Sequence, residues 1–307
     1  MKKFLSLMLT LTLCAIVYAQ APWKTNILTN GSAESGTYDG WTKTTNGGSG
    51  WAIGWGPEGT RTFVSSYSNC VLTQDIDLEA KGFTTTELDG GCKAMLQGYA
   101  AGGASSGSRS GVMKMIVYLL DANKNVLQTV TLVDITFTNA PDWTEYDQQT
   151  TLPEGTRYIR YQITGKDAIF WAGQYGPNFT GMSVRLCQPN DEFKFTVTNE
   201  MYSNGSVKWM GNTEMDPNGN SSIAVTPGTA VSFTLTPDVG CELLRYSVKY
   251  ALGNVPVTEN GTTFRFTMPK SDVVITPVFE KTEVPSISED GYYNIIMQIH
   301  LNGLPIR

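Results

Sequence analysis

The chain has 307 residues, 22 of them Lys or Arg and 28 Asp or Glu, and its length makes two domains the expectation. The single histidine, His300, excludes zinc sites built from several histidines and any Ser-His-Asp device in the main body of the chain. The net charge of −6, with no basic cluster, argues against a nucleic-acid partner.

Residues 1–19 have the pattern of a secretory signal peptide. Lys2 and Lys3 precede an apolar run, and Ala19 closes the small-residue pattern at which such signals are cleaved. The run is shorter than the ~20 residues of a membrane span, and no later segment approaches that length. We therefore expect a secreted or cell-surface protein without a membrane span, which in a bacterium means the outer surface or the periplasm. Loss of the two lysines leaves a net charge of −8.

Residues 23–188 alternate short apolar strands with turns, which is typical of an all-β sandwich or jelly roll. Asp and Asn in segment 121–125 separate two apolar runs and predict a hairpin. In segment 158–163 every second residue is apolar, so one face of this strand is expected to be buried. The Gly- and Ser-rich segment 102–111 is expected to be a long loop.

Residues 191–281 contain a second series of short alternating strands, separated by turn sequences such as Asn260-Gly261. Pro and Asn in segment 188–190 interrupt both patterns and predict the domain boundary. The fold class is therefore all-β, with a sandwich followed by a small all-β repeat module. Residues 282–307 follow as a tail.

Four cysteines remain after the signal peptide: Cys70, Cys92, Cys187 and Cys241. An even number in an exported protein permits disulfides, with three possible pairings. The irregular spacing and the length of the chain favour buried free thiols, and disulfides remain the alternative.

Metal and acid-base chemistry are both disfavoured. Segment 121–125 has the alternate spacing of a calcium loop, but Val126 stands where such a loop needs Gly. Carboxylate pairs such as Asp142 and Glu145 lie in hydrophilic surroundings, without the apolar pocket that raises the pKa of a catalytic acid. We expect no enzymatic activity, no metal site and no cofactor.

Aromatic residues are the more informative class. Several tryptophans lie beside glycines, as Trp51 and Trp55 do, and for each one core packing is favoured over an open stacking surface for a sugar. Segment 166–177 differs, because it places three aromatic residues with Lys, Asp and Gln in a glycine-bounded loop between two strands. Loops in such positions commonly carry binding function.

Characteristic fragments occur in order along the first domain. They are 30–36 with Gly40-Trp41, 63–67, Cys70, 74–78, 155–160, 165–167, 170–173 and 175–176. Over residues 26–187 this series resembles the F-box-associated domain, the glycoprotein-recognising module of sugar-binding F-box proteins, and its secreted bacterial relatives. The resemblance implies a galactose-binding-like jelly roll, a glycan or glycoprotein as partner, and free cysteines. Since no F-box precedes the domain, we expect no ubiquitin-ligase partner.

The resemblance also implies a binding site. Sugar-binding members contact the inner chitobiose of N-glycans through aromatic residues of two loops and a Lys. Those aromatic roles fall on Tyr67, Phe170 and Trp171, while the Lys position is Ala172, which offers no charged donor. Additional ligand contacts are expected from neighbouring side chains, namely Lys166, Asp167, Gln174 and Tyr175.

The second domain resembles the internalin B-type repeats of bacterial surface proteins. The matching fragments are 205–207, 226–229, 233–238, 264–273 and 278–279. Such modules commonly serve as spacers or adhesive units on exported proteins. Fragments 292–295 and 302–305 of the tail are similar to C-terminal sorting segments of Bacteroidetes proteins. The leading hypothesis is a non-catalytic carbohydrate-binding protein, and the alternative is a structural or adhesive surface protein that binds no sugar.

Overall fold

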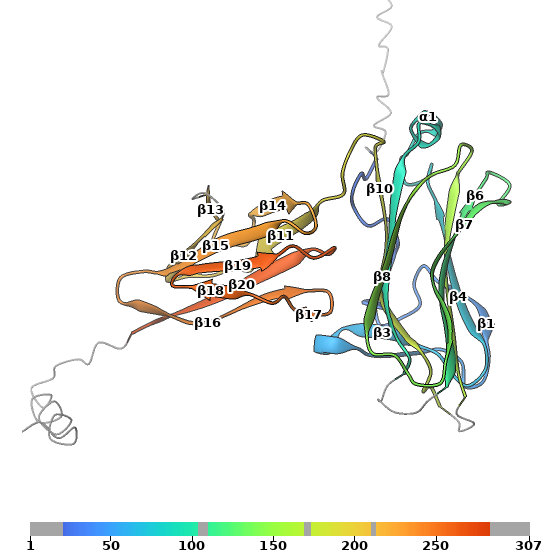
Figure 1. Cartoon of the computed structure of the whole chain (residues 1–307), viewed down its shortest axis with the longest axis horizontal. Coiled ribbons are helices and arrows are strands. Elements are labelled where there is room, and N and C mark those ends of the chain that lie inside the picture. Colours follow the sequence, from blue (N-terminus) through green and yellow to red (C-terminus); the bar gives the residue numbers. More distant parts are fainter. Residues whose placement is uncertain (1–20, 104–109, 169–172, 210–212, 283–307) are drawn as a thin grey trace, which may run out of the picture. The chain divides into compact units, whose positions relative to one another are not determined.

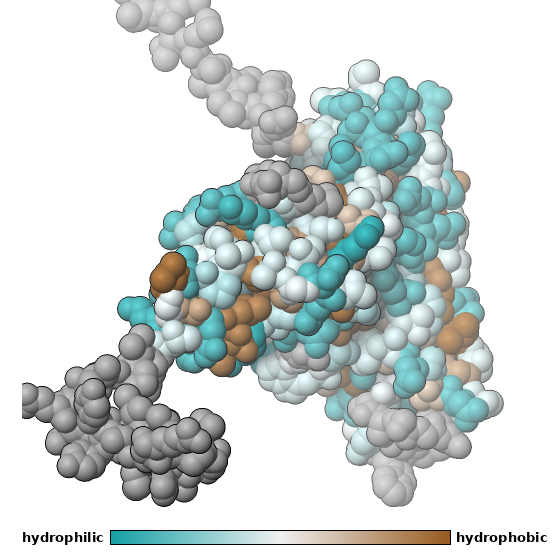
Figure 2. Space-filling model, turned by 60° about the vertical axis from the view of Figure 1, so that its left-hand side comes forward, coloured by the Kyte–Doolittle hydropathy of each residue, from teal (hydrophilic) through white to brown (hydrophobic). Residues whose placement is uncertain are grey.

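The computed structural model describes residues 21–282 except 104–109, 169–172 and 210–212. It divides into two compact units, the first ending at Phe193 and the second beginning at Lys194 (Figure 1). The predicted signal peptide and nearly all of the tail lie outside the described residues, as does most of the loop predicted at 102–111. Hydrophilic and neutral residues cover most of the face shown in Figure 2, and hydrophobic residues form only small patches on it.

The first unit is a β-sandwich of two five-stranded sheets, with the strand orders β1-β4-β9-β6-β7 and β2-β3-β10-β5-β8 (Figure 1). All pairings in both sheets are antiparallel. The elements are β1 Thr42–Asn46, β2 Ala52–Trp55, a 3-10 turn Pro57–Gly59, β3 Arg61–Val64, β4 Cys70–Asp77, α1 Thr85–Asp89, β5 Lys93–Ala101, β6 Gly111–Leu120, β7 Val126–Phe137, β8 Thr144–Thr151, β9 Tyr158–Asp167 and β10 Asn178–Cys187. The predicted all-β sandwich is confirmed.

The core lies between the two sheets and follows the alternation of the sequence. In β9, Ile159, Tyr161 and Ile163 are fully buried, as the pattern of segment 158–163 predicts. Trp41 and Trp51 are 7% and 5% exposed and belong to the same core. Each fully buried large apolar side chain contributes about 1.5–3 kcal/mol to folding.

Core packing is the wrong prediction for Trp55, which is 65% exposed. This residue ends β2, which forms one edge of its sheet. Its neighbour Ile53 on the same face still packs against the core. The strand therefore passes beyond the core before it reaches Trp55.

The predicted hairpin joins β6 to β7. The Asp121 carboxylate accepts hydrogen bonds from the backbone N–H groups of Asn123 and Asn125, both at 2.8 Å, and from the Asn125 side chain at 2.9 Å. Lys124 takes up the positive φ of 62° that the turn requires. The Asp121 oxygens thus stabilise a turn in the way that Asx residues do. Within the described residues no group of three or more His, Cys, Asp or Glu side chains is arranged to hold a metal ion.

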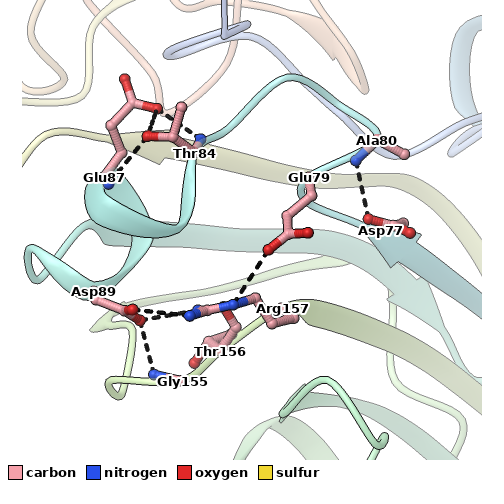
Figure 3. A network of polar contacts seen from close by, with 9 residues as sticks. All are labelled: Asp77, Glu79, Ala80, Thr84, Glu87, Asp89, Gly155, Thr156 and Arg157. Carbon is pink, nitrogen blue, oxygen red and sulfur yellow. Dashed lines mark hydrogen bonds and ion pairs between the residues drawn. The ribbon is translucent and has the colours of Figure 1, made fainter.

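Ion pairs hold one end of the first unit (Figure 3). Arg157, just before β9, donates two hydrogen bonds to the Asp89 carboxylate, at 2.9 and 2.8 Å, and its Nε lies 3.3 Å from Glu79. Thr84 and Glu87 close a capping box at the start of α1. Since β9 begins at this end and runs the length of the sheet, its last residue, Asp167, lies at the opposite end.

The second unit is also all-β, as predicted, with two further five-stranded sheets, β14-β11-β20-β16-β17 and β13-β12-β15-β19-β18. The strands are β11 Phe195–Asn199, β12 Gly205–Trp209, β13 Thr213–Glu214, β14 Ser222–Val225, β15 Ala230–Pro237, β16 Cys241–Tyr250, β17 Gly253–Asn254, β18 Thr258–Asn260, β19 Thr263–Thr267 and β20 Val273–Lys281. β11 and β20 pair in parallel. The Phe233 ring stacks on Phe264 and meets Phe266 edge-on, at centroid distances of 5.3 and 6.2 Å.

The four cysteines of the described residues are free thiols, and Cys70, Cys92 and Cys187 are buried. Burial raises the pKa of Cys92 to about 11 and also raises the pKa values of Cys70 and Cys187. These three thiols are therefore protonated at neutral pH. No helix in the described part of the chain is both long enough and apolar enough to span a bilayer.

Candidate site at the loop end of the sandwich

A pocket of about 280 Å³ opens at the end of the first unit where β9 finishes. It is lined by Tyr67, Ser68, Lys166, Asp167 and Ala168. The pocket brings together two segments about a hundred residues apart, because β4 pairs with β9 and the Asp167 N–H donates to the Ser66 carbonyl at 3.0 Å. Three of the predicted site residues, Tyr67, Lys166 and Asp167, share this pocket.

The other predicted residues lie elsewhere or outside the described part of the chain. Phe170 and Trp171 belong to segment 169–172, which is not described. The Gln174 side chain donates to the Ser49 carbonyl at 2.9 Å and thereby joins two loops. Tyr175 is exposed.

The pocket walls combine an aromatic ring with polar groups of different kinds. Tyr67 is half-buried and Lys166 is exposed, whereas Asp167 is only 2% exposed. The Asp167 carboxylate also contributes to the raised pKa of the Cys70 thiol, although burial of that thiol is the larger cause. A ring face, an ammonium donor, a hydroxyl and a carboxylate acceptor can bind a ligand that carries several hydroxyl groups on an otherwise apolar frame.

Ser66, which precedes the pocket residue Tyr67, connects its own loop to the loops that carry Ser49 and Gly173. Its buried hydroxyl accepts from the Ser49 N–H at 2.9 Å and donates to the Gly173 carbonyl at 2.8 Å. The Gly173 N–H in turn donates to the Ser49 hydroxyl at 2.9 Å. The network fixes the loop that follows segment 169–172 against the loop that carries Tyr67.

Ser65 holds the next part of the same loop. Its backbone carbonyl accepts from the Gly176 N–H at 3.1 Å, and its hydroxyl donates to the Pro177 carbonyl at 3.2 Å. A Cβ atom at Gly165 or Gly176 would lie only 2.2 or 2.4 Å from the Ser65 hydroxyl oxygen. Both positions therefore require glycine, because a methyl group has no room there.

Sequence reasoning gave Ser49, Ser65 and Ser66 no part in the site, since a serine in a turn or at the end of a strand indicates only a loop. The glycines at 165 and 176 were the available signal. They mark places where another segment approaches the backbone closely.

The first unit is thus an antiparallel β-sandwich of two five-stranded sheets with its candidate site among the end loops. The family model of the F-box associated region matches residues 18–186, and the chain belongs to this family. Residues 195–283 match the model of the divergent InlB B-repeat domain.

Curated relatives of the first unit include F-box only protein 6 of Bos taurus, which is 32% identical over 183 residues. That match covers 55% of this chain and 68% of the relative. F-box only protein 44 of Mus musculus is 28% identical, with 57% of this chain and 72% of the relative covered. Among solved structures, the CBM22-1 xylan-binding domain of Paenibacillus barcinonensis Xyn10C matches with a TM-score of 0.32 and 17% identity, over 51% of this chain and 92% of that domain.

Proposed function

We propose that this chain is a non-catalytic carbohydrate- or glycoprotein-binding protein whose first unit holds a saccharide in the pocket beside Tyr67. The supporting observation is that Tyr67, Lys166 and Asp167 line one pocket. The sequence indicated each of these residues as a ligand contact independently of the pocket. Membership of the F-box-associated family supports the same assignment, because the sequence resembles its sugar-binding members.

Each pocket residue has a definite part in the proposed binding. The Tyr67 ring stacks against the C–H face of a sugar ring, while Lys166 donates hydrogen bonds to sugar oxygens and Asp167 accepts them. A volume of about 280 Å³ lies just below the ~300–1,000 Å³ that is usual for small-ligand sites and suits one or two sugar rings. Binding at a single pocket of this size is weak, and multivalent display of the ligand would raise it.

The place of action belongs to the same proposal. Residues 1–19 support export, and the match of residues 195–283 to a repeat domain supports a role of the second unit as a spacer. The repeat match also favours the second candidate function, a structural or adhesive surface protein that binds no sugar. Neither proposal assigns the chain an enzymatic activity, a cofactor or a ubiquitin-ligase partner.

A glycan array decides between the two functions. It compares the wild-type chain with Tyr67→Ala and with Tyr118→Ala, a matched control that removes a half-buried tyrosine from the outer face of β6. We expect Tyr67→Ala to lower glycan binding by at least tenfold, while Tyr118→Ala leaves it unchanged. A folded wild-type chain that binds no glycan on the array would contradict the proposal and favour the structural role.

A further inference from the structure

Trp55 is held in place without being buried. Trp55 and Arg61 lie opposite each other in the β2–β3 pairing, and the Arg61 Cζ atom is 3.6 Å from the indole centroid. The guanidinium therefore covers one face of the ring and restricts its rotation. Because Trp55 remains 65% exposed with that face covered, its opposite face is open to solvent.

The residues that flank Trp55 leave the ring unobstructed. Gly54 and Gly56 stand on either side of it, and neither has room for a side chain. A Cβ atom at Gly54 would lie 2.6 Å from the Val64 side chain, and one at Gly56 would lie 2.7 Å from the Thr60 hydroxyl oxygen. Packing against these neighbours thus favours glycine at both positions, so neither residue next to Trp55 in the chain carries a side chain that could cover the indole.

This surface is separate from the pocket. Arg61 begins β3, and Tyr67 follows six positions later, beyond the other end of that strand. The strand rises about 3.3 Å per residue, so its two ends, Arg61 and Val64, lie about 10 Å apart. A ligand on Trp55 therefore does not need the contacts that Tyr67 provides.

We propose that Trp55 and Arg61 form a second saccharide-binding surface, which takes one sugar ring of an oligosaccharide on the open face of the indole. An indole ring that has one face covered by Arg61 and the other face open to solvent can stack against the C–H face of a sugar. A stable protein interface buries about 800 Å² on each partner. Among the described side chains of segment 52–64, Trp55 is the sole exposed large hydrophobic residue, which favours a single sugar ring over a protein surface.

The test uses the full chain carrying Tyr67→Ala, so that the pocket does not contribute. Triacetylchitotriose and lactose serve as probes, and the Trp55 indole N–H signal is followed by NMR after assignment with Trp55→Phe. We expect this signal to shift saturably with at least one probe. Trp55→Ala in the same background should lower saturation transfer to that probe by at least tenfold. Trp23→Ala serves as the control, because Trp23 is a half-buried tryptophan of the same unit that packs edge-on against Phe83.

Three results would overturn the proposal. The first is an indole signal that neither probe moves, and the second is probe binding that Trp55→Ala leaves unchanged. The third is a signal that shifts with protein concentration but not with sugar, which would assign the surface to a protein contact. Failure of the proposed function of the pocket is detected separately. In that case the wild-type chain binds glycans and Tyr67→Ala leaves this binding unchanged.

Discussion

The two ends of the first unit are held together by different chemistry. At one end, Arg157 pairs with Asp89 and Glu79, and the contacts run between charged side chains that are partly exposed. At the other end, Ser65 and Ser66 bond to backbone groups of neighbouring loops, and glycines allow the approach. The strength of a solvent-exposed ion pair depends on pH and salt. Neutral hydrogen bonds around a buried serine depend instead on how closely the surrounding groups pack. The end that carries the pocket is therefore the more sensitive to small changes in side-chain volume.

The largest effect is expected for Gly165→Ala. The new methyl group would meet the Ser65 hydroxyl at 2.2 Å, so the loop must move or the strand must bend. We expect a loss of about 3 kcal/mol in the free energy of unfolding, measured by urea denaturation. Lys166→Ala, at the exposed next position, is the control and should cost less than about 0.5 kcal/mol. Equal stability of the two variants would show that the close approach of Ser65 does not require glycine at position 165.

Ser66→Ala should have the next largest effect. It removes the hydroxyl that accepts from Ser49 and donates to Gly173, which corresponds to about 1–2 kcal/mol for the two bonds. Glycan binding should weaken as well, because the two loops would no longer be fixed. Unfolding and array measurements on this variant are compared with Ser35→Ala, which changes a serine in an exposed turn. A variant that loses stability and binds glycans normally would show that the network has no part in recognition.

Arg157→Ala tests the end that is held by charges. The substitution leaves Asp89 and Glu79 without their cation, and partly exposed ion pairs of this kind are worth about 1 kcal/mol at most. Thermal unfolding at low and at high salt is the measurement. The difference from wild type should shrink in high salt, and glycan binding should be unaffected. A salt-independent loss would instead indicate packing of the Arg157 side chain.

The smallest effect concerns pH. Hydrogen bonds from Arg157 lower the pKa of Asp89 to about 2, and those from Arg160 lower the pKa of Asp75 to about 2. A carboxyl group with a lowered pKa stabilises the folded state above its ordinary value of 3.8, and this contribution is lost as the pH falls towards 2. Melting temperatures should therefore decrease between pH 4 and pH 2, and less steeply in Asp89→Asn. The cost of Ser66→Ala should stay constant across the same range.

The fold could be predicted to the level of strands and turns because its signals are local. Alternation in segment 158–163 predicts the buried face of β9, and Asp121 predicts the hairpin through contacts within four residues. The exposure of Trp55 could not be predicted in this way, because the composition of a strand does not show where the strand extends beyond the core. The packing of Trp41 and Trp51 was correctly predicted from their residue type alone.

The candidate site could be predicted in part. The family resemblance pointed to Tyr67, and the composition of segment 166–177 pointed to Lys166 and Asp167; these three residues line one pocket. The serine network was beyond reach, since Ser66 and Gly173 are separated by 107 positions and Ser49 and Gly173 by 124. No local pattern encodes such contacts. Gln174 was expected at the ligand, and its side chain donates a hydrogen bond that joins two loops, which the sequence did not indicate.

The buried thiols have a consequence for where this chain can fold. Cys92 is 1% exposed and has a pKa of about 11, so it presents almost no thiolate to an oxidant. Cys70 and Cys187 are fully buried and also have raised pKa values. The first unit needs no disulfide to reach its structure, and a change of redox environment gives it little to react with. Its fold is therefore suited equally to reducing and to oxidising compartments.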